Sequence, residues 1–300
     1  MLTRTFATSG GPVDLGGTLF PLRRGTGDPT TAIEGGEAWR TLRTPEGAAT
    51  LHLAARGTSI DVAAWGSGAA WAVESAPALV GADDTAEGFV AHDPVVASLR
   101  RRHRGLRLTR TGTVLPLLIA AVLEQKVTGA EARRAWRGLV GATAEPAPGP
   151  RSDLRLPPDP ARVAALPSFA FHRLGVERRR AEVIRALCAR PARIESLVDL
   201  EPSEARARLL AHRGIGPWTA AEVGRLALGD PDAVSVGDYH LPHLVAWLLA
   251  GEPRGTDERM LELLEPYRGQ RGRVQRLLEA SGAHAPRFGP RMEIRSIARL

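Results

Sequence analysis

The chain has 300 residues, of which 43% are hydrophobic and 24% are charged, so it can build a substantial core, and its length suggests two or three subdomains. Its 40 lysines and arginines against 33 acidic residues give a formal net charge of +7, which favours a polyanionic partner, nucleic acid before anionic membrane. A single cysteine excludes a disulfide framework and a four-cysteine zinc or iron–sulfur site. The longest apolar run, residues 114–123, is about half of the ~20 residues that a membrane span needs.

Arginine carries almost all of the positive charge, since Lys126 is the only lysine. A GC-rich coding bias, which also raises alanine, glycine and proline, explains much of this surplus, so arginine content alone is a weak sign of phosphate binding. Cys188 lies in an apolar helical pattern and is expected to be a buried structural thiol. The first residues lack the charged and apolar regions of a signal peptide. We therefore expect a cytoplasmic protein.

The amino-terminal part contains short runs of clustered or alternating apolar residues bounded by turn residues, notably at 48–54 and 59–65. These runs predict strands of a small antiparallel sheet. A helix-like spacing of Trp71, Val73 and Leu79 follows at residues 69–80. This part of the chain is therefore predicted to be a mixed α+β module.

After this module the apolar spacing is helical, apart from a segment at 145–160 with six prolines that we interpret as a surface loop or linker. Asp93 and Pro94 start the first helix, which runs into the arginine-rich residues 100–104. We interpret that end, with His103, as a solvated basic face, and contact with flanking phosphates is the alternative. Further helices are predicted at 114–123, 130–140, 160–166, 177–189, 201–212, 217–228, 239–249, 257–264 and 272–281, and the basic tail 283–300 is expected to lack regular structure.

Two of these helices, 201–212 and 217–228, are joined by a turn that contains Gly214, Ile215 and Gly216. Glycines on either side of one aliphatic residue allow a tight reversal, and Ile215 can fill the space between the helices. The proline that follows suits the first turn of a helix. Backbone N–H groups at such a helix start can bind one DNA phosphate without reading sequence. The alternative is a plain helix–turn–helix corner closed by glycine.

Asp238 lies 22 residues after Gly216, directly before the predicted helix 239–249. An isolated aspartate before a helix is most simply an N-cap. A helix start also stabilises an ionised carboxylate. A capping role and an electrostatic role in catalysis are therefore compatible.

The hairpin at 214–220 followed by residues 236–239 resembles the signature of the helix-hairpin-helix DNA glycosylase superfamily, and within it that of the bacterial 3-methyladenine DNA glycosylase II branch. The likeness covers residues 85–280 well and the amino-terminal module loosely. Three further stretches are similar to this branch: residues 105–108 leading into 118–130 with Glu124, Gln125, Lys126 and Val127; residues 174–176 with Arg180 and Ala181; and Pro266, Tyr267 and Arg268.

The resemblance implies an α+β fold class, with a mostly α-helical glycosylase core of two helical subdomains and a small amino-terminal antiparallel α+β domain. The active site is expected in the cleft between the helical subdomains. The boundaries implied for this chain are 1–85 for the amino-terminal domain, 110–230 for the helical domain with the hairpin at 201–228, and 86–109 together with 231–300 for the second helical subdomain.

The superfamily's catalytic aspartate corresponds to Asp238. Breaking an N-glycosidic bond builds positive charge on the deoxyribose, which an ionised carboxylate in a dry cleft stabilises, and the same group can orient or deprotonate the attacking water. The base must first be flipped out of the duplex. Bifunctional members carry a lysine where this chain has Trp218, so strand cleavage through a Schiff base is not expected.

The resemblance thus implies a monofunctional glycosylase that excises damaged bases, with alkylated purines first, from double-stranded DNA in base excision repair. We expect a monomeric, nucleoid-associated bacterial enzyme that needs no cofactor, metal or membrane. Two alternatives stay open: a glycosylase for deaminated or oxidised bases, and a non-catalytic hairpin protein that only binds DNA. Asp238 discriminates against the second, since a binding module does not need a carboxylate there.

Trp218 and Tyr239 are the candidate walls of the base pocket, because electron-rich rings select cationic alkylated purines by stacking and cation–π attraction. The branch often has another aromatic residue four positions after the tryptophan, where this chain has Glu222. A carboxylate also favours a cationic base, but this departure leaves the lesion open. Another possible source of pocket surface is a local cluster, for which we favour packing instead: Phe169, Phe171 and His172.

The DNA contacts are expected at the hairpin and at the turn after the predicted helix 114–123. In that turn, Gln125 is expected to fill the gap left by the flipped base. Lys126 either reaches a phosphate or lies at a solvated helix end. The expected contacts in the hairpin are Gly214, Ile215, Gly216 and Thr219.

Overall fold

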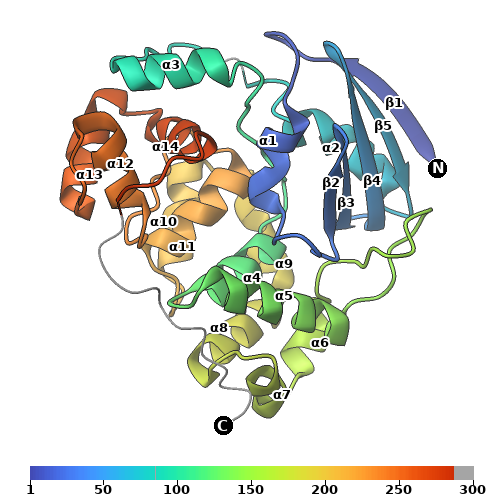
Figure 1. Cartoon of the computed structure of the whole chain (residues 1–300). Helices are drawn as coiled ribbons and strands as arrows, with labels where there is room; N and C mark the ends of the chain where they lie inside the picture. The colour runs from blue at the N-terminus through green and yellow to red at the C-terminus, as the bar shows by residue number, and fades with distance from the viewer. Residues whose placement is uncertain (85, 287–300) are drawn as a thin grey trace.

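The computed structural model describes residues 1–84 and 86–286. An antiparallel sheet lies at one side of the molecule and a group of helices at the other (Figure 1). None of the helices in the described part of the chain is long and apolar enough to cross a membrane. Most of the tail predicted at 283–300 lies outside the described residues.

The amino-terminal sheet has five antiparallel strands in the order β1-β5-β4-β3-β2, which confirms the predicted α+β module. Gly35 and Gly36, with φ of 58° and 83°, form the two-residue turn between β2 and β3, a turn that needs left-handed backbone at both positions. Helix α2 covers the central strands (Figure 1). The elements are β1 (Leu2–Ala7), α1 (Leu15–Leu19), β2 (Thr31–Glu34), β3 (Glu37–Thr44), β4 (Gly47–Arg56), β5 (Ser59–Trp65) and α2 (Ala69–Leu79), with a 3-10 turn at Phe20–Leu22.

The rest of the described chain is helical, as predicted. Its helices are α3 (Pro94–Arg102), α4 (Leu115–Glu124), α5 (Gly129–Thr143), α6 (Pro160–Ala165), α7 (Ser168–Arg173), α8 (Arg178–Cys188), α9 (Pro191–Glu195), α10 (Pro202–Leu210), α11 (Pro217–Val223), α12 (Leu241–Ala250), α13 (Asp257–Leu264) and α14 (Arg271–Ala280). Short 3-10 turns lie at Ser196–Asp199 and Glu265–Tyr267, and a π-helical turn lies at Gly224–Leu228.

Two helix boundaries differ from the predictions near the hairpin. The predicted helix 217–228 ends as α11 at Val223 and continues as the π-helical turn, which Gly229 closes in a left-handed conformation with φ of 69°. The predicted helix 239–249 begins two residues later, as α12, because the chain first turns around the Asp238 side chain.

The proline-rich segment 145–160 is more than a surface loop. Pro146 pairs with Arg155 in an antiparallel bridge, and Leu154 is only 2% exposed. The segment also binds the sheet, because the Thr41 hydroxyl donates to the Arg155 carbonyl at 2.6 Å and Arg43 Nε donates to the Pro157 carbonyl at 2.9 Å. This segment therefore fixes the sheet against the helices.

The buried apolar side chains form two clusters. The larger one runs from the sheet through α4, α5 and α8 to the hairpin helices α10 and α11. The smaller one joins α3 to α12, α13 and α14. Cys188 is buried in the larger cluster, and burial raises the pKa of its thiol to about 12, as expected for a structural cysteine. The residue boundaries predicted for the subdomains stay a prediction.

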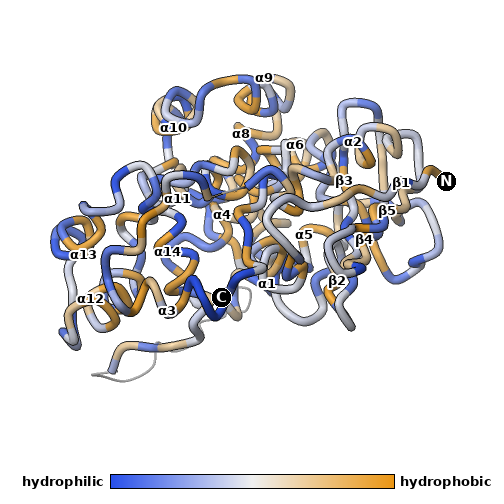
Figure 2. Tube along the Cα trace, turned by 90° about the horizontal axis from the view of Figure 1, so that it is seen from above, coloured by the Kyte–Doolittle hydropathy of each residue, from blue (hydrophilic) through white to orange (hydrophobic). Residues whose placement is uncertain are grey.

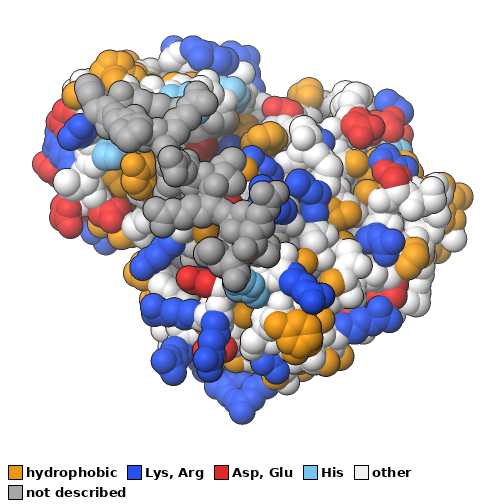
Figure 3. Space-filling model, turned by 60° about the horizontal axis from the view of Figure 1, so that its bottom comes forward, with side chains coloured by type: hydrophobic (Ala, Val, Ile, Leu, Met, Phe, Trp, Pro, Cys, Tyr) orange, Lys and Arg blue, Asp and Glu red, His pale blue; other side chains and the backbone are white. Residues whose placement is uncertain are grey.

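Positive side chains are not confined to one region. Figure 3 shows Lys and Arg side chains scattered over one face of the molecule, with Asp and Glu between them. This distribution agrees with a general arginine surplus, so a functional claim for any arginine must rest on its local contacts.

Candidate active site

Asp238 lies in the turn before α12, and both of its carboxylate oxygens accept hydrogen bonds. Oδ1 accepts from the backbone N–H of His240 at 2.7 Å and of Leu241 at 2.8 Å, so the capping contact expected from the sequence is present. Oδ2 accepts from Trp218 Nε1 at 2.9 Å. The carboxylate is thus held in one orientation by donors from two different elements, and hydrogen bonds from N–H groups stabilise its negative charge.

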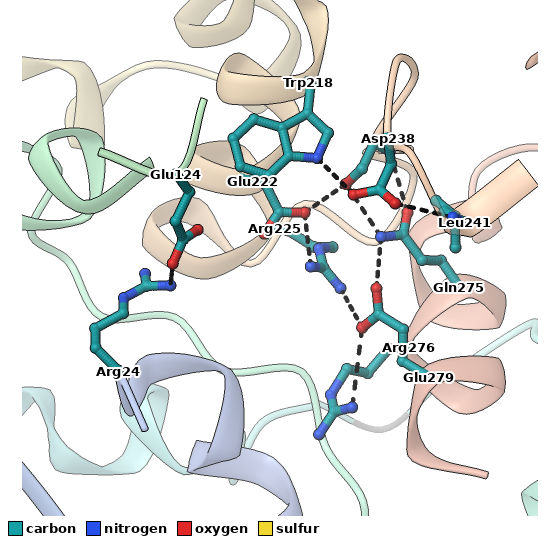
Figure 4. Close-up of polar contacts among 11 residues, drawn as sticks. Arg24, Glu124, Trp218, Glu222, Arg225, Asp238, Leu241, Gln275, Arg276 and Glu279 are labelled. Carbon is teal, nitrogen blue, oxygen red and sulfur yellow. Dashed lines mark hydrogen bonds and ion pairs between the residues drawn. The ribbon is translucent and has the colours of Figure 1, made fainter. Parts of the chain in front are cut away.

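Trp218 reaches Asp238 from the first turn of α11, on the hairpin. The turn that carries Asp238 can approach the indole because Gly237 adopts φ of 91°, a conformation that favours glycine. Figure 4 shows the indole and the Asp238 carboxylate at one edge of the site. The sequence named both residues separately, and the structure brings them into direct contact.

Glu222 lies one helical turn after Trp218, so both side chains occupy one face of α11. Its Oε1 accepts from Arg225 Nη2 at 2.8 Å and from the Ser235 hydroxyl. Ser235 precedes Asp238 by three residues, and its carbonyl accepts from the Asp238 N–H at 3.2 Å. Glu222 therefore lies beside the aspartate's turn and next to the indole (Figure 4).

Arg225 lies in the π-helical turn and joins Glu222 to α14. Its Nη1 donates to Glu279 Oε2 at 2.9 Å, and its side chain is only 5% exposed. Gln275 completes this network, because its Nε2 donates to the Ser235 hydroxyl at 3.0 Å and to Glu279 Oε1 at 2.8 Å. Two carboxylates thus share one buried guanidinium, and Arg276 is a more distant partner of Glu279, at 4.0 Å. We call Glu222, Arg225 and Glu279 the acidic cluster.

The two carboxyl groups of the acidic cluster have opposite pKa shifts. Burial raises the pKa of Glu222, against the attraction of Arg225. Burial also acts to raise the pKa of Glu279, but the charge of Arg225 and a hydrogen bond from Gln275 outweigh it and hold that pKa below its usual value. Glu222 is therefore the member of the cluster that takes up a proton first as the pH falls.

A second ion pair faces the acidic cluster. Arg24 Nη1 lies 2.9 Å from Glu124 Oε1, and their side chains are 13% and 28% exposed. Figure 4 shows this pair across an open space from Trp218 and Glu222, and the negative charge of Glu124 contributes to the raised pKa of Glu222. Arg24 comes from the amino-terminal module, so no local sequence pattern indicated its presence here.

The hairpin turn uses its two glycines differently. Gly214 has φ of 87°, and a Cβ there would overlap the Val183 side chain. Gly216 has φ of −102°, and no atom lies within 4 Å of a Cβ placed on it. Ile215 is 6% exposed and packs in the larger apolar cluster, as the sequence predicted. The fold therefore requires glycine at position 214. At position 216 a side chain would meet no other protein atom, so the backbone there is open to a ligand.

Two expected DNA contacts are instead used inside the protein. Gln125 Nε2 donates to the Gly214 carbonyl at 3.0 Å and to the Thr219 hydroxyl at 2.9 Å, so its amide braces the hairpin, and its role in DNA stays a prediction. Thr219 is only 2% exposed and cannot present its hydroxyl to a phosphate. Lys126 is exposed beside this brace, with φ of 54°.

The other aromatic candidates do not gather around Asp238. The Tyr239 ring is 80% exposed and lies edge-on to His240. Phe171 is fully buried in the larger cluster, as the packing interpretation expected, while Phe169 is 65% exposed. Their helix, α7, packs against α8 at the opposite end of the helical group from α12 (Figure 1), so His172 on the same helix is also remote from the site.

Known proteins resemble this chain in sequence and in fold, although no protein-family model matches it. Two Mycobacterium tuberculosis proteins, from strains CDC 1551 and H37Rv, are described as probable bifunctional transcriptional activator/DNA repair enzyme AlkA. Each is 31% identical over 153 residues, which is 50% of this chain and 30% of the relative. The match thus spans less than a third of these relatives' length.

Solved structures share nearly the whole fold. The 3-methyladenine DNA glycosylase from Archaeoglobus fulgidus has a TM-score of 0.79 at 18% identity, over 92% of this chain and 97% of that one. The 8-oxoguanine glycosylase/lyase of Clostridium acetobutylicum, in complex with double-stranded DNA, has a TM-score of 0.67 at 11% identity, over 93% and 97%.

The five-stranded antiparallel sheet followed by a helical core is thus the fold of these two solved glycosylase structures. In sequence, half of the chain is similar to the AlkA proteins of M. tuberculosis, and in fold the chain is similar to the 3-methyladenine glycosylase of A. fulgidus.

The hairpin glycines give the first testable prediction. Gly214→Ala should destabilise the protein by about 2–4 kcal/mol, because it combines a strained left-handed residue with overpacking against Val183. Gly216→Ala should leave the free energy of unfolding within about 0.5 kcal/mol, as expected for a site without steric conflict. Its added methyl group should occupy the open space where a phosphate would lie, and weaken duplex binding roughly tenfold, the cost of about one charge-assisted hydrogen bond. Urea unfolding and fluorescence anisotropy with a lesion-free duplex measure the two effects. Unchanged duplex affinity in Gly216→Ala would contradict a phosphate seat at this turn.

Proposed function

We propose that the chain is a monofunctional DNA glycosylase of base excision repair, with Asp238 as its catalytic carboxylate. One observation carries the proposal: the Asp238 carboxylate is held by Trp218 Nε1 at 2.9 Å, on the same hairpin that would hold the DNA backbone. This contact couples the element suited to DNA binding with a carboxylate suited to glycosidic chemistry.

Asp238 can stabilise the transition state of base release without being consumed. Cleavage of the N-glycosidic bond leaves positive charge on the deoxyribose, and a carboxylate already fixed in place needs no reorganisation to stabilise it. Its oxygens can also orient an attacking water. The three N–H donors around Asp238 hold the carboxylate ready for this role.

The tryptophan at the position of the lyase lysine supports simple hydrolysis. The indole N–H of Trp218 is occupied by Asp238, and no amine is present at that position to attack the sugar. Lys126 is the only lysine, and it lies exposed in the turn beyond α4. Base release should therefore leave an intact abasic strand.

The charges around the site support a cationic lesion. Trp218 offers one aromatic face, while Glu222 and Asp238 add negative charge beside it. The flanking ion pairs of Arg225 and Arg24 each involve carboxylates, so the site does not gain a surplus of positive charge. An alkylated purine carries a positive charge that such a site attracts, whereas an unmodified purine does not. We therefore propose N-alkylated purines as the lesion class.

Replacing the aspartate tests the chemistry. Asp238→Asn keeps one acceptor oxygen for the N–H groups of His240 and Leu241, but it removes the charge and places an amide donor opposite Trp218 Nε1. It should lower the rate of release of 7-methylguanine from duplex DNA by about 100-fold or more, as is typical for loss of one electrostatic contact to a transition state. Glu182→Gln, on the exposed side of α8, is the control. Equal rates in wild type and Asp238→Asn would refute the catalytic role, provided that anisotropy shows equal duplex binding.

The absence of a lyase step is tested separately. Strand breaks should arise only after hot alkali, because hydrolysis leaves the abasic sugar in place. Sodium borohydride should trap no covalent protein–DNA complex, since this reagent reduces a Schiff base. If a complex does form, comparison with Lys126→Ala will show whether the only lysine is the attacking amine, and the monofunctional proposal fails.

The raised pKa of Glu222 gives a pH-dependent prediction for the lesion class. Glu222 takes up a proton at a pH where an exposed glutamate is still charged, so attraction for a cationic base weakens as the pH falls. The ratio of 7-methylguanine release to hypoxanthine release should therefore fall in wild type from pH 7 to pH 5. Using a ratio cancels any titration of groups that both reactions share.

In Glu222→Gln this ratio should be lower at pH 7, by roughly tenfold for a loss of ~1.4 kcal/mol of attraction, and should not change with pH. Glu182→Gln should behave like wild type. A ratio that falls with pH equally in Glu222→Gln would show that Glu222 does not set the preference.

A further inference from the structure

A cavity with a volume of about 500 Å³ lies away from Asp238, between α3, the turn after it and α14. Its lining is rich in positive charge, and among the described residues that line it Asp84 is the only carboxylate. The arginines that line it are Arg100, Arg101, Arg104, Arg107, Arg273 and Arg276. We call this cavity the arginine pocket.

Only part of this charge is neutralised. Arg273 and Asp84 form a bidentate pair, with N–O distances of 2.8 Å and 2.5 Å, which neutralises the charge of Asp84. Arg276 lies 4.0 Å from Glu279, outside the pocket lining. Within the described part of the chain, no carboxylate lies within ion-pair distance of the other four arginines. The arginine pocket therefore keeps a surplus of positive charge.

Backbone carbonyls, which carry no formal charge, hold two of these guanidinium groups in place. Arg100 Nη1 donates to the Phe89 carbonyl at 2.9 Å, and its guanidinium lies 5.3 Å from the centre of the Phe89 ring. Arg107 donates to the carbonyls of Arg104 and Gly10 at 2.8 Å and 2.9 Å. The positive groups are thus oriented before any ligand arrives, which lowers the entropic cost of binding.

Two buried nitrogen atoms of lining residues have no hydrogen-bond partner: His103 Nε2 and Arg107 Nε. Buried polar atoms in folded proteins are nearly always paired, and an unpaired one calls for a missing partner. An anion in the pocket can accept from the N–H of Arg107 Nε, and from His103 Nε2 in the tautomer that carries a hydrogen there. The orphaned atoms and the uncompensated charge therefore point to the same kind of ligand.

The arginine pocket is separated from the DNA-binding hairpin by a helix. In Figure 1 and, from above, in Figure 2, α14 lies between α3 and the hairpin helices α10 and α11. A phosphate held at Gly216 thus lies on the other side of α14 from the pocket. The arginine-rich end of α3 is not simply the solvated face that the sequence suggested, since it forms one rim of a cavity.

We propose that the arginine pocket binds a compact anion with several phosphate groups, such as a polyphosphate or the phosphate chain of a nucleotide. Arginine forks match phosphate oxygens in pairs, and the volume is that of a small-ligand site. A single phosphate would leave most of the surplus charge uncompensated. The proposal does not depend on the glycosylase activity.

The probe for this proposal is inorganic triphosphate, titrated into the full chain by calorimetry at constant ionic strength. The test variant is Arg101→Ser with Arg104→Ser, two exposed side chains at the pocket rim. The control is Arg134→Ser with Arg137→Ser, two exposed arginines on α5 that give the same change of charge. Wild type and control should bind one triphosphate, and the test variant should bind it at least tenfold more weakly.

Equal binding by the test and control variants would show that general positive charge attracts the probe, and would overturn the proposal. A competition experiment with lesion-free duplex tests whether the pocket binds the phosphates of DNA and not those of a small ligand. If the duplex displaces triphosphate and the test variant loses more duplex affinity than the control, the pocket is a DNA contact and the proposal of a small ligand is wrong. We expect the duplex and triphosphate to bind together.

Discussion

The buried guanidinium of Arg225 is the interaction on which the site depends. It is 5% exposed and binds carboxylates from two elements, Glu222 on α11 and Glu279 on α14. Removing such a partner leaves buried charge uncompensated, which costs about 3–5 kcal/mol. Because α11 packs in the larger apolar cluster and α14 in the smaller one, Arg225 also joins the two cores at the point where the Asp238 turn runs between them.

The π-helical turn places Arg225 in this position. π-helical turns are rare in proteins, and those that occur often lie at functional sites. Here α11 ends at Val223, and the π-helical turn that follows ends at Gly229. Arg225 lies within this wider turn, from which its guanidinium contacts both Glu222 and Glu279. A regular helix over 217–228, as the sequence pattern predicted, would rotate this arginine differently. The departure from regular geometry therefore coincides with the buried ion pairs of Arg225 beside the site.

What could be predicted from the sequence was local. The glycine turn, the buried Ile215 and the capping Asp238 each have a short-range signature, and the structure agrees with them. Gln125 and Thr219, predicted as DNA contacts, bond to each other, because spacing does not show whether a polar side chain faces outward or bonds to a neighbour. Their mutual hydrogen bond joins residues 94 positions apart, which no periodicity reveals.

The long-range members of the site could not be identified for a related reason. Arg24 is one of 40 basic residues in the sequence, and it reaches Glu124 only because the proline-rich segment and the sheet fix the amino-terminal module against the helices. Gln275 and Glu279 likewise belong to an ordinary amphipathic pattern on α14. Their roles follow from packing of elements that are distant in sequence, and the same packing makes the predicted proline-rich loop a structural connector.

Helix α14 separates two regions of opposite charge. Gln275 and Glu279, four residues apart and so on one face, bind toward Ser235 and Arg225. Arg273 and Arg276, three residues apart, line the arginine pocket. The acidic cluster would attract a cationic base, while the pocket would repel it and attract anions. Because Arg276 still lies 4.0 Å from Glu279, the two regions are in electrostatic contact through the helix, and an anion that draws Arg276 toward the pocket would leave Glu279 more dependent on Arg225.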